Sequence, residues 1–342
     1  MQVTRRSFVL GGTAVLTALG RATPLLASVL EDAQSRAALP DQRLEEGWEF
    51  YKGPLDPRFQ IWYSQELVTW EPMTVPHCFN AYDGCDPDVP AYRGPGWYRR
   101  KLKVANPYTN GRTLLHFEGA GQRAEVYVGN TLVASHSGGY DEFNVDITEP
   151  CRALKPGDEL ALAVLCDNGR DIERMPSDLS DFTLYGGLYR HVHLVYLPQI
   201  SFEAVHAHVD FEPGRGATIV ITARLHAPEA NAKDVELQIG VEDPQGHSVF
   251  QSTLKRAIWT GEAAVAKFEI ASPMLWSPST PNLYRCTVSA TAAGDAASVS
   301  HRFGVRHAQF ETHGPFLLNG QRLLIRGTHR HEDHAGYAAA MP

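Results

Sequence analysis

The stretch Ala124-Glu-Val-Tyr-Val-Gly-Asn-Thr-Leu-Val-Ala134 carries the clearest fold signal in this chain. Two largely apolar runs, 124–128 and 131–134, flank Gly129-Asn130, which predicts two antiparallel strands joined by a two-residue hairpin. Further along, residues 158–165 are apolar on both faces and predict a central strand. No convincing period of 3.6 residues interrupts the region from Leu44 to Leu197, so a β-sandwich of about 150 residues is expected there.

The region from 200 to 306 repeats this pattern at the size of an immunoglobulin-like domain. Two faces alternate along its first run: Val205, Ala207, Val209 and Phe211 on one, His206, His208 and Asp210 on the other. Later runs bring the expected total to about seven strands, as a small sandwich requires. The Cys-Trp-Cys spacing of antibody domains is absent.

Composition excludes several classes of protein. The chain has 342 residues, 43% of them hydrophobic, so we expect about two globular domains. The net charge of −8, without a basic run, argues against nucleic acid as a partner. Five scattered cysteines form no Cys-x-x-Cys pair, so neither a disulfide scaffold nor a zinc site is expected. Three His-x-His pairs occur, but two of them lie at outward positions of predicted strands, and we predict no metal site.

The N-terminus resembles a targeting signal. Thr4-Arg5-Arg6-Ser7-Phe8-Val9-Leu10 is a twin-arginine pattern, followed by an apolar stretch to about Leu19. That stretch is too short to span a bilayer, which needs about 20 residues. We therefore predict a twin-arginine signal peptide over 1–28, no membrane span, and a periplasmic or extracellular mature protein. The alternative is a buried N-terminal helix.

Three motifs in order are more specific. They are Val75-Pro76-His77 with Tyr92-Arg-Gly-Pro-Gly-Trp-Tyr-Arg-Arg100; Gly138-Gly-Tyr-Asp-Glu-Phe143 with Asp181-Phe-Thr-Leu-Tyr-Gly-Gly-Leu-Tyr-Arg190; and Phe316-Leu-Leu-Asn-Gly-Gln-Arg-Leu-Leu-Ile-Arg-Gly-Thr-His-Arg-His-Glu-Asp-His334. Together they resemble glycoside hydrolase family 2, the group of β-galactosidases, β-glucuronidases and β-mannosidases. The resemblance covers nearly everything after residue 40.

This resemblance implies an all-β chain with a defined domain order. A jelly-roll sugar-binding β-sandwich would occupy 41–199, an immunoglobulin-like β-sandwich 200–306, and the truncated start of a (β/α)8 TIM barrel 307–342. A TIM barrel needs at least about 200 residues, far more than follow 306. Asn319-Gly320 predicts a hairpin turn and residues 323–326 the first barrel strand. Because a buried parallel strand needs neighbours, we expect residues from about 311 onward to be poorly ordered.

The resemblance also suggests residues that contact substrate. Asp181 matches a position where a sandwich loop reaches the barrel mouth and a carboxylate accepts hydrogen bonds from sugar hydroxyls. Otherwise it caps a turn. His331 matches a histidine that lines the sugar subsite, and otherwise it is an exposed loop residue. The family usually has Asn at the position of His329 and often Pro at that of Ala335, so the local loop shape differs.

Three further residues are candidates for substrate binding. Arg326 either binds substrate or serves as a barrel-interior or salt-bridge residue. Tyr92 and Arg93 lie on a loop that approaches the substrate, or else they pack at a domain interface. We expect no cofactor in this chain, although the resemblance allows a monovalent or divalent cation in a complete enzyme.

Two functional hypotheses follow. In the first, the chain is the N-terminal part of an exported β-galactosidase-like glycosidase that acts on terminal β-linked sugars. Retaining glycosidases need two carboxyl groups about 5–5.5 Å apart. The resemblance places both on later barrel strands, so this chain alone should be inactive. In the second, it is a non-catalytic carbohydrate-binding or complementing module. Carbohydrate is the expected partner in both, while the sugar and the oligomeric state stay open.

Overall fold

The fold is described from a computed structural model. The described residues are 42–57, 60–62, 68–86, 88, 90–155, 157–174, 182–227, 233–329 and 334–341. The predicted signal peptide over 1–28 and the candidate residues Asp181 and His331 therefore lie outside the described residues. Among the residues that are described, no helix is both long and apolar enough to cross a membrane.

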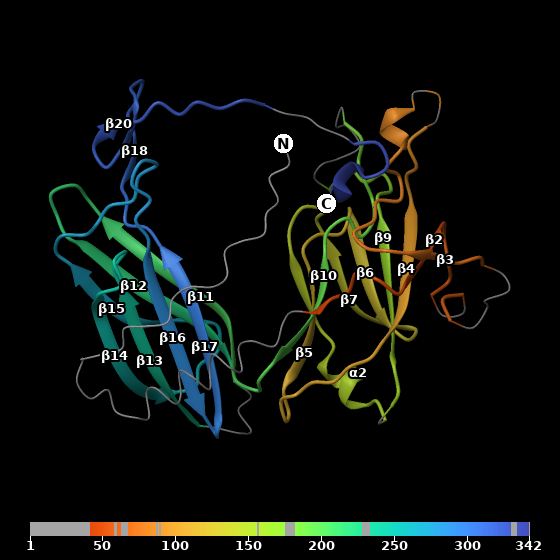
Figure 1. The fold of residues 1–342 in the computed structure, drawn as a ribbon, viewed down its shortest axis with the longest axis horizontal. Helices are drawn as coiled ribbons and strands as arrows, with labels where there is room; N and C mark the ends of the chain where they lie inside the picture. Colours follow the sequence, from red (N-terminus) through yellow and green to blue (C-terminus); the bar gives the residue numbers. More distant parts are fainter. Residues whose placement is uncertain are drawn as a thin grey trace, which may run out of the picture. The chain divides into compact units, whose positions relative to one another are not determined.

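The first sandwich consists of two antiparallel sheets (Figure 1). One sheet has the order β1 (Gln42–Arg43), β10 (Val192–Leu197), β5 (Arg112–Phe117), β8 (Phe143–Asp146). The other has the order β3 (Glu71–Met73), β2 (Trp48–Lys52), β4 (Pro95–Leu102), β9 (Leu160–Asp167), β6 (Arg123–Val128), β7 (Thr131–Ser137). Two short helices, η2 (Asp83–Cys85) and α2 (Thr148–Arg152), lie in the connections.

Local patterning explains this arrangement. Strands β6 and β7 pair across Gly129-Asn130 with Val128 opposite Thr131, which confirms the predicted hairpin. Strand β9 lies between β4 and β6, as its apolar character on both faces predicted. Large side chains from both sheets, including Trp48, Tyr98 and Phe117, meet in one buried core. At about 25 cal/mol per Å² of buried apolar surface, this core is the main stabilising term of the sandwich.

In its described residues, the second sandwich contains seven strands, in line with the expected number of about seven. One sheet has the order β11 (Ser201–Phe211), β12 (Ala217–His226), β15 (Glu262–Ile270). The other has the order β14 (Ser248–Ala257), β13 (Asp234–Glu242), β16 (Tyr284–Ala292), β17 (Asp295–Phe303). Val205 and Phe211 face the core while His206, His208 and Asp210 are exposed, as predicted. This sandwich closes a core of its own.

Residues after 306 differ from the expectation. Instead of a poorly ordered tail, β18 (Ala308–Phe310), β19 (Phe316–Leu318) and β20 (Gln321–Arg322) form an antiparallel meander. Asn319 and Gly320 connect β19 to β20 with φ of 54° and 77°, which confirms the predicted hairpin. The Asn319 side chain then fastens the meander, donating to the Trp276 carbonyl at 3.0 Å and accepting from the His307 backbone N–H at 2.9 Å.

The predicted barrel strand over 323–326 does not form. This segment has no strand structure, and Leu324 and Ile325 are 64% and 69% exposed. A parallel barrel strand exchanges hydrogen bonds with a neighbour on each side. Here the backbone N–H of Leu323 donates to the Phe316 carbonyl of β19 at 3.0 Å, and none of the described strands pairs with residues 324–326. The chain continues to a short 3₁₀ turn, η3 (Ala338–Ala340).

Candidate functional site

The loops that carry the first two sequence motifs gather at one end of the first sandwich. We call this the motif end and define it by residues 75–80, 92–95, 119–122, 138–140 and 184–189. Backbone hydrogen bonds join these loops: the N–H of His77 donates to the Leu188 carbonyl at 2.7 Å, and that of Gly121 to the Gly187 carbonyl at 3.1 Å. The motifs are therefore neighbours in space although far apart in sequence.

Asn80 is the first of two buried amides that order the motif end. Its side chain is 1% exposed, and its Nδ2 donates to the Leu184 carbonyl at 3.0 Å. Its Oδ1 accepts the backbone N–H of Gly186 at 2.9 Å. Because a buried amide is costly unless its donors and acceptors are paired, these contacts hold the Leu184–Gly186 backbone in one conformation.

Asn168, just after β9, is the second buried amide. It is fully buried, and its Nδ2 donates to the carbonyls of Tyr92 at 3.0 Å and Leu184 at 2.9 Å. Its Oδ1 accepts the backbone N–H of Gly94 at 2.9 Å. One side chain therefore fixes the Tyr92–Gly94 loop relative to the loop that begins at Leu184.

Tyr92 and Arg93 lie at the motif end, as adjacent members of one loop. The Tyr92 hydroxyl donates to the Pro95 carbonyl at 2.9 Å, and its backbone N–H donates to Asp83 Oδ2 at 2.6 Å. Arg93 Nη1 donates to the Asn168 carbonyl at 3.5 Å. Burial, then the nearby Asp167 carboxylate, raises the pKa of Tyr92. The Tyr92 hydroxyl thus braces its own loop, and the other two contacts join that loop to η2 and to the end of β9. Substrate contact by either residue stays a prediction.

Arg326 is not part of this gathering. It lies exposed in the segment after β20, outside the loops that define the motif end. Asp181 and His331 lie outside the described residues. The structure therefore brings together two of the five candidate residues, the pair already adjacent in sequence.

His77 is a partly buried titratable group that sequence reasoning did not single out. Its Nδ1 lies 2.8 Å from the hydroxyl of buried Tyr98, and its ring contacts Phe50 edge-on at 4.8 Å between centroids. Burial, and secondarily the Lys52 ammonium, lowers the pKa of His77 from 6.5 to about 4. The imidazole is thus neutral near pH 7. Its place beside Val75-Pro76 in the first motif was the available signal.

The Gly138-Gly139 stretch joins the same end of the sandwich. The backbone N–H of Gly138 donates to the Gln122 carbonyl at 3.0 Å, and the Tyr189 hydroxyl donates to the carbonyl of Gly139. Burial raises the pKa of Tyr189 far above its ordinary value, so this hydroxyl keeps its proton and acts as a donor.

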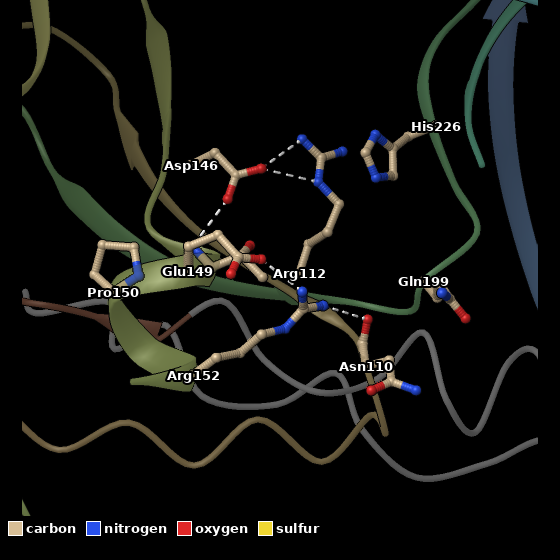
Figure 2. Close-up of a pocket in the computed structure, with 9 residues that line it drawn as sticks. Asn110, Arg112, Asp146, Glu149, Pro150, Arg152, Gln199 and His226 are labelled. Carbon is tan, nitrogen blue, oxygen red and sulfur yellow. Dashed lines mark hydrogen bonds and ion pairs between the residues drawn. The ribbon is translucent and has the colours of Figure 1, made fainter. Parts of the chain in front are cut away.

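A separate polar pocket of about 420 Å³ lies at the α2 end of the first sandwich (Figure 2). Its lining is Asn110, Arg112, Asp146, Thr148, Glu149, Pro150, Arg152, Gln199 and His226. Figure 2 shows the Arg112 guanidinium between Asp146, to which it donates at 3.1 and 3.2 Å, and the His226 ring. Arg152 is likewise bound to Glu149 at 2.7 Å. The charges of this pocket pair with one another, and its lining does not include Tyr92, Arg93 or Arg326, the predicted substrate residues that the structure describes.

The histidine pairs do not assemble into a metal centre in the part of the chain that is described. No group of three His, Cys, Asp or Glu side chains there is placed to hold a metal ion. The Nε2 atom of His193 instead lies 3.0 Å from a carboxylate oxygen of Glu118. His206 stacks loosely on His208, with 6.3 Å between ring centroids.

Comparison with known proteins identifies the two sandwiches. Residues 55–198 match the family model "Glycosyl hydrolases family 2, sugar binding domain", and residues 200–306 match "Glycosyl hydrolases family 2". Among curated relatives, the chain is 29% identical to a β-galactosidase from Thermoanaerobacter pseudethanolicus, over 86% of this chain and 39% of the relative.

Solved structures give the same picture. A β-glucuronidase from Parabacteroides merdae is 42% identical with a TM-score of 0.81, over 89% of this chain and 40% of that one. β-Glucuronidase 3 from Bacteroides uniformis is 44% identical with a TM-score of 0.76 and the same coverage. The chain thus spans about two fifths of the length of these relatives. With both domain matches in order along one chain, this protein belongs to family 2 of the glycosyl hydrolases.

Proposed function

We propose that this chain supplies the sugar-binding and immunoglobulin-like domains of a family 2 β-glycosidase that hydrolyses terminal β-linked sugars. The observation that carries the proposal is the motif end, where Asn80 and Asn168 hold the Tyr92–Gly94 and Leu184–Gly186 loops together. In the complete enzyme, Tyr92, Arg93, Asp181, Arg326 and His331 would contact the sugar. Carboxylate and guanidinium groups suit this task, since they accept and donate hydrogen bonds to hydroxyl groups.

The catalytic pair would come from sequence beyond this chain. Retention of configuration by double displacement needs a nucleophilic carboxylate and an acid/base carboxyl about 5–5.5 Å apart. The family resemblance assigns both to later strands of a TIM barrel. The chain alone should therefore bind sugar weakly at most and hydrolyse nothing.

β-Glucuronides are the substrate class we favour. Support comes from the solved β-glucuronidases at 42% and 44% identity, against 29% for the β-galactosidase relative. We also propose that the protein is exported by the twin-arginine route, on the strength of Arg5-Arg6 and the apolar stretch that follows.

A panel of nitrophenyl β-glucuronide, β-galactoside and β-mannoside tests the proposal in two steps. The purified chain should release no nitrophenol above the buffer rate. The same chain fused to the barrel of the Parabacteroides merdae enzyme should cleave the glucuronide preferentially. Turnover that copurifies with the isolated chain would contradict the assignment of catalysis to the barrel. A folded fusion without activity on any glycoside would contradict the glycosidase proposal.

A non-catalytic sugar-binding module is the second candidate, because each sandwich closes a core of its own and neither needs a barrel to bury it. The DNA directly downstream of the Pro342 codon separates the two candidates. In-frame barrel sequence with paired Glu codons supports the enzyme, and a stop codon with no barrel sequence nearby supports the module.

A further inference from the structure

The segment His334–Met341, which we call the strap, returns to the first sandwich. Ala338 and Ala340 are 4% and 6% exposed, and they pack in one cluster with Cys78, Ala81, Tyr185 and Tyr189. The backbone N–H of Gly336 donates to the Ala81 carbonyl at 3.4 Å. Small side chains suit this surface, since the cluster buries alanine methyl groups between two tyrosine rings and a thiol.

The backbone of the strap is bent to make these contacts. Gly336 has φ of 86°, and a Cβ at this position would lie 2.8 Å from the Tyr82 hydroxyl. Ala338 has φ of 44°, a left-handed conformation that costs a non-glycine residue about 1 kcal/mol. Such a residue persists only when its surroundings over-determine its conformation. Burial of Ala338, together with its N–H donation to the His334 carbonyl at 2.7 Å, supplies that restraint.

The surface beneath the strap belongs to the motif end. Cys78 directly follows His77, and Tyr185 and Tyr189 flank Gly186-Gly187. Cys78 is 5% exposed, and its Sγ donates to Asn80 Oδ1 at 3.4 Å. Burial raises the pKa of the Cys78 thiol, and the backbone N–H of Ala339 partly opposes that rise by hydrogen bonding to the sulfur. The strap and Asn80 thus both contact this thiol.

The chain before the strap is anchored elsewhere. His307 Nδ1 donates to the Phe211 carbonyl at 3.0 Å, and Asn319 Nδ2 donates to the Trp276 carbonyl. Both acceptors belong to the second sandwich. His307 and Asn319 are therefore bonded to the second sandwich, whereas the strap contacts the first.

We propose that residues 334–341 form a releasable strap that docks on the Cys78–Ala81–Tyr185–Tyr189 surface, covers part of the motif end, and ties the tail of this chain to the first sandwich. The docked surface is small and its occupant carries backbone strain, so docking is a local equilibrium that can open without unfolding either sandwich. Release uncovers the Cys78 thiol.

Thiol labelling of the full chain tests this proposal, with N-ethylmaleimide as the reagent and peptide mass spectrometry to assign each site. Ala338→Asp places a carboxylate in the buried cluster and should raise the labelling rate of Cys78 at least tenfold. Ala335→Asp, the same change at an exposed position, is the matched control and should leave that rate as in the unaltered chain. Exposed Cys85 reports that the reagent is active, and fully buried Cys166 and Cys286 report that both sandwiches stay folded.

Gly336→Ala provides a second variant that adds no charge to the buried cluster. An alanine backbone disfavours φ of 86°, and its Cβ would also lie 2.8 Å from the Tyr82 hydroxyl, at the movable end of an exposed side chain. Cys78 should therefore again label faster while Cys166 and Cys286 stay protected. If Ala338→Asp exposes all the buried cysteines, that variant has unfolded, and the labelling rate of Cys78 in Gly336→Ala then tests the proposal. Unchanged protection of Cys78 in a folded Gly336→Ala chain would overturn the proposal.

Discussion

Asn80 and Asn168 donate side-chain N–H groups to the same acceptor, the backbone carbonyl of Leu184, at 3.0 and 2.9 Å. A carbonyl oxygen has two lone pairs, and here both are used by buried amides. The shared acceptor links the loop after Val75-Pro76 to the end of β9. The loop that starts at Leu184 is thereby held from two sides, which is why the motif end has a defined shape.

Asn168→Ala should destabilise the first sandwich by about 3 kcal/mol. The substitution removes partners from the Gly94 N–H and the Tyr92 carbonyl, and each buried unsatisfied group costs about 1–3 kcal/mol. Urea unfolding followed by the fluorescence of core tryptophans should show the first-sandwich transition at lower urea. Asn144→Ala at an exposed position is the control and should shift that transition by less than about 0.5 kcal/mol. Equal shifts for the two variants would argue against the clamp.

His77 should make the stability of the first sandwich depend on pH. Burial and then Lys52 lower its pKa from 6.5 to about 4, so between these values the unfolded chain binds a proton that the folded chain does not. The stability that neutral His77 contributes is complete above pH 6.5 and declines as pH falls toward 4, by up to about 1.4 kcal/mol per pH unit. In His77→Gln this part of the decline should disappear.

Urea midpoints at pH 7.5, 6.0 and 5.0 measure the His77 effect as a difference between the variant and the unaltered chain. His313→Gln, at an exposed position in the tail, is the control substitution. Parallel pH profiles for the unaltered chain and His77→Gln would show that other groups cause the dependence.

Asn319→Ala should loosen the β18–β20 meander without unfolding the second sandwich. The change removes the side-chain hydrogen bonds to Trp276 and His307. It also replaces an asparagine, which tolerates φ of 54°, by a residue that adopts this conformation less readily. Limited proteolysis should then cleave between 306 and 322 several-fold faster and leave 42–303 as a protected fragment. Gln309→Ala, an exposed position on the same meander, serves as the control. Loss of the whole second sandwich on Asn319→Ala would make the meander an integral part of that domain.

The double substitution Arg5→Lys with Arg6→Lys should retain the protein in the cytoplasm with its signal peptide still attached. The reason is that the twin-arginine route recognises the arginine pair. Arg21→Lys changes an arginine outside the pair and should be exported normally. Cell fractionation followed by intact mass measurement distinguishes these outcomes. Export and trimming of the double variant would remove the basis for the localisation proposal.

Local patterns in the sequence predicted the hairpins at Gly129-Asn130 and Asn319-Gly320, the central strand β9 and the two β-sandwiches. Alternation with period two sets which side chains face a core, as in Val205 and His206. Positive-φ residues such as Asn319-Gly320 set where the chain reverses. Both signals act over a few neighbouring residues, so they can be read without knowing the rest of the fold.

Only the tertiary structure decided how the motif end is built. Buried amides such as Asn80 and Asn168 acquire their role from acceptors that lie far away in sequence, and no local pattern announces them. Burial turns His77 into a neutral group, and the Tyr92 hydroxyl braces Pro95 of its own loop. The segment at 323–326 shows the converse. Its residues favour a strand, yet no described strand pairs with residues 324–326, because a strand forms only where hydrogen-bond partners lie beside it. Each of these features depends on contacts between residues that are far apart in the sequence, and a local sequence pattern does not reveal such contacts.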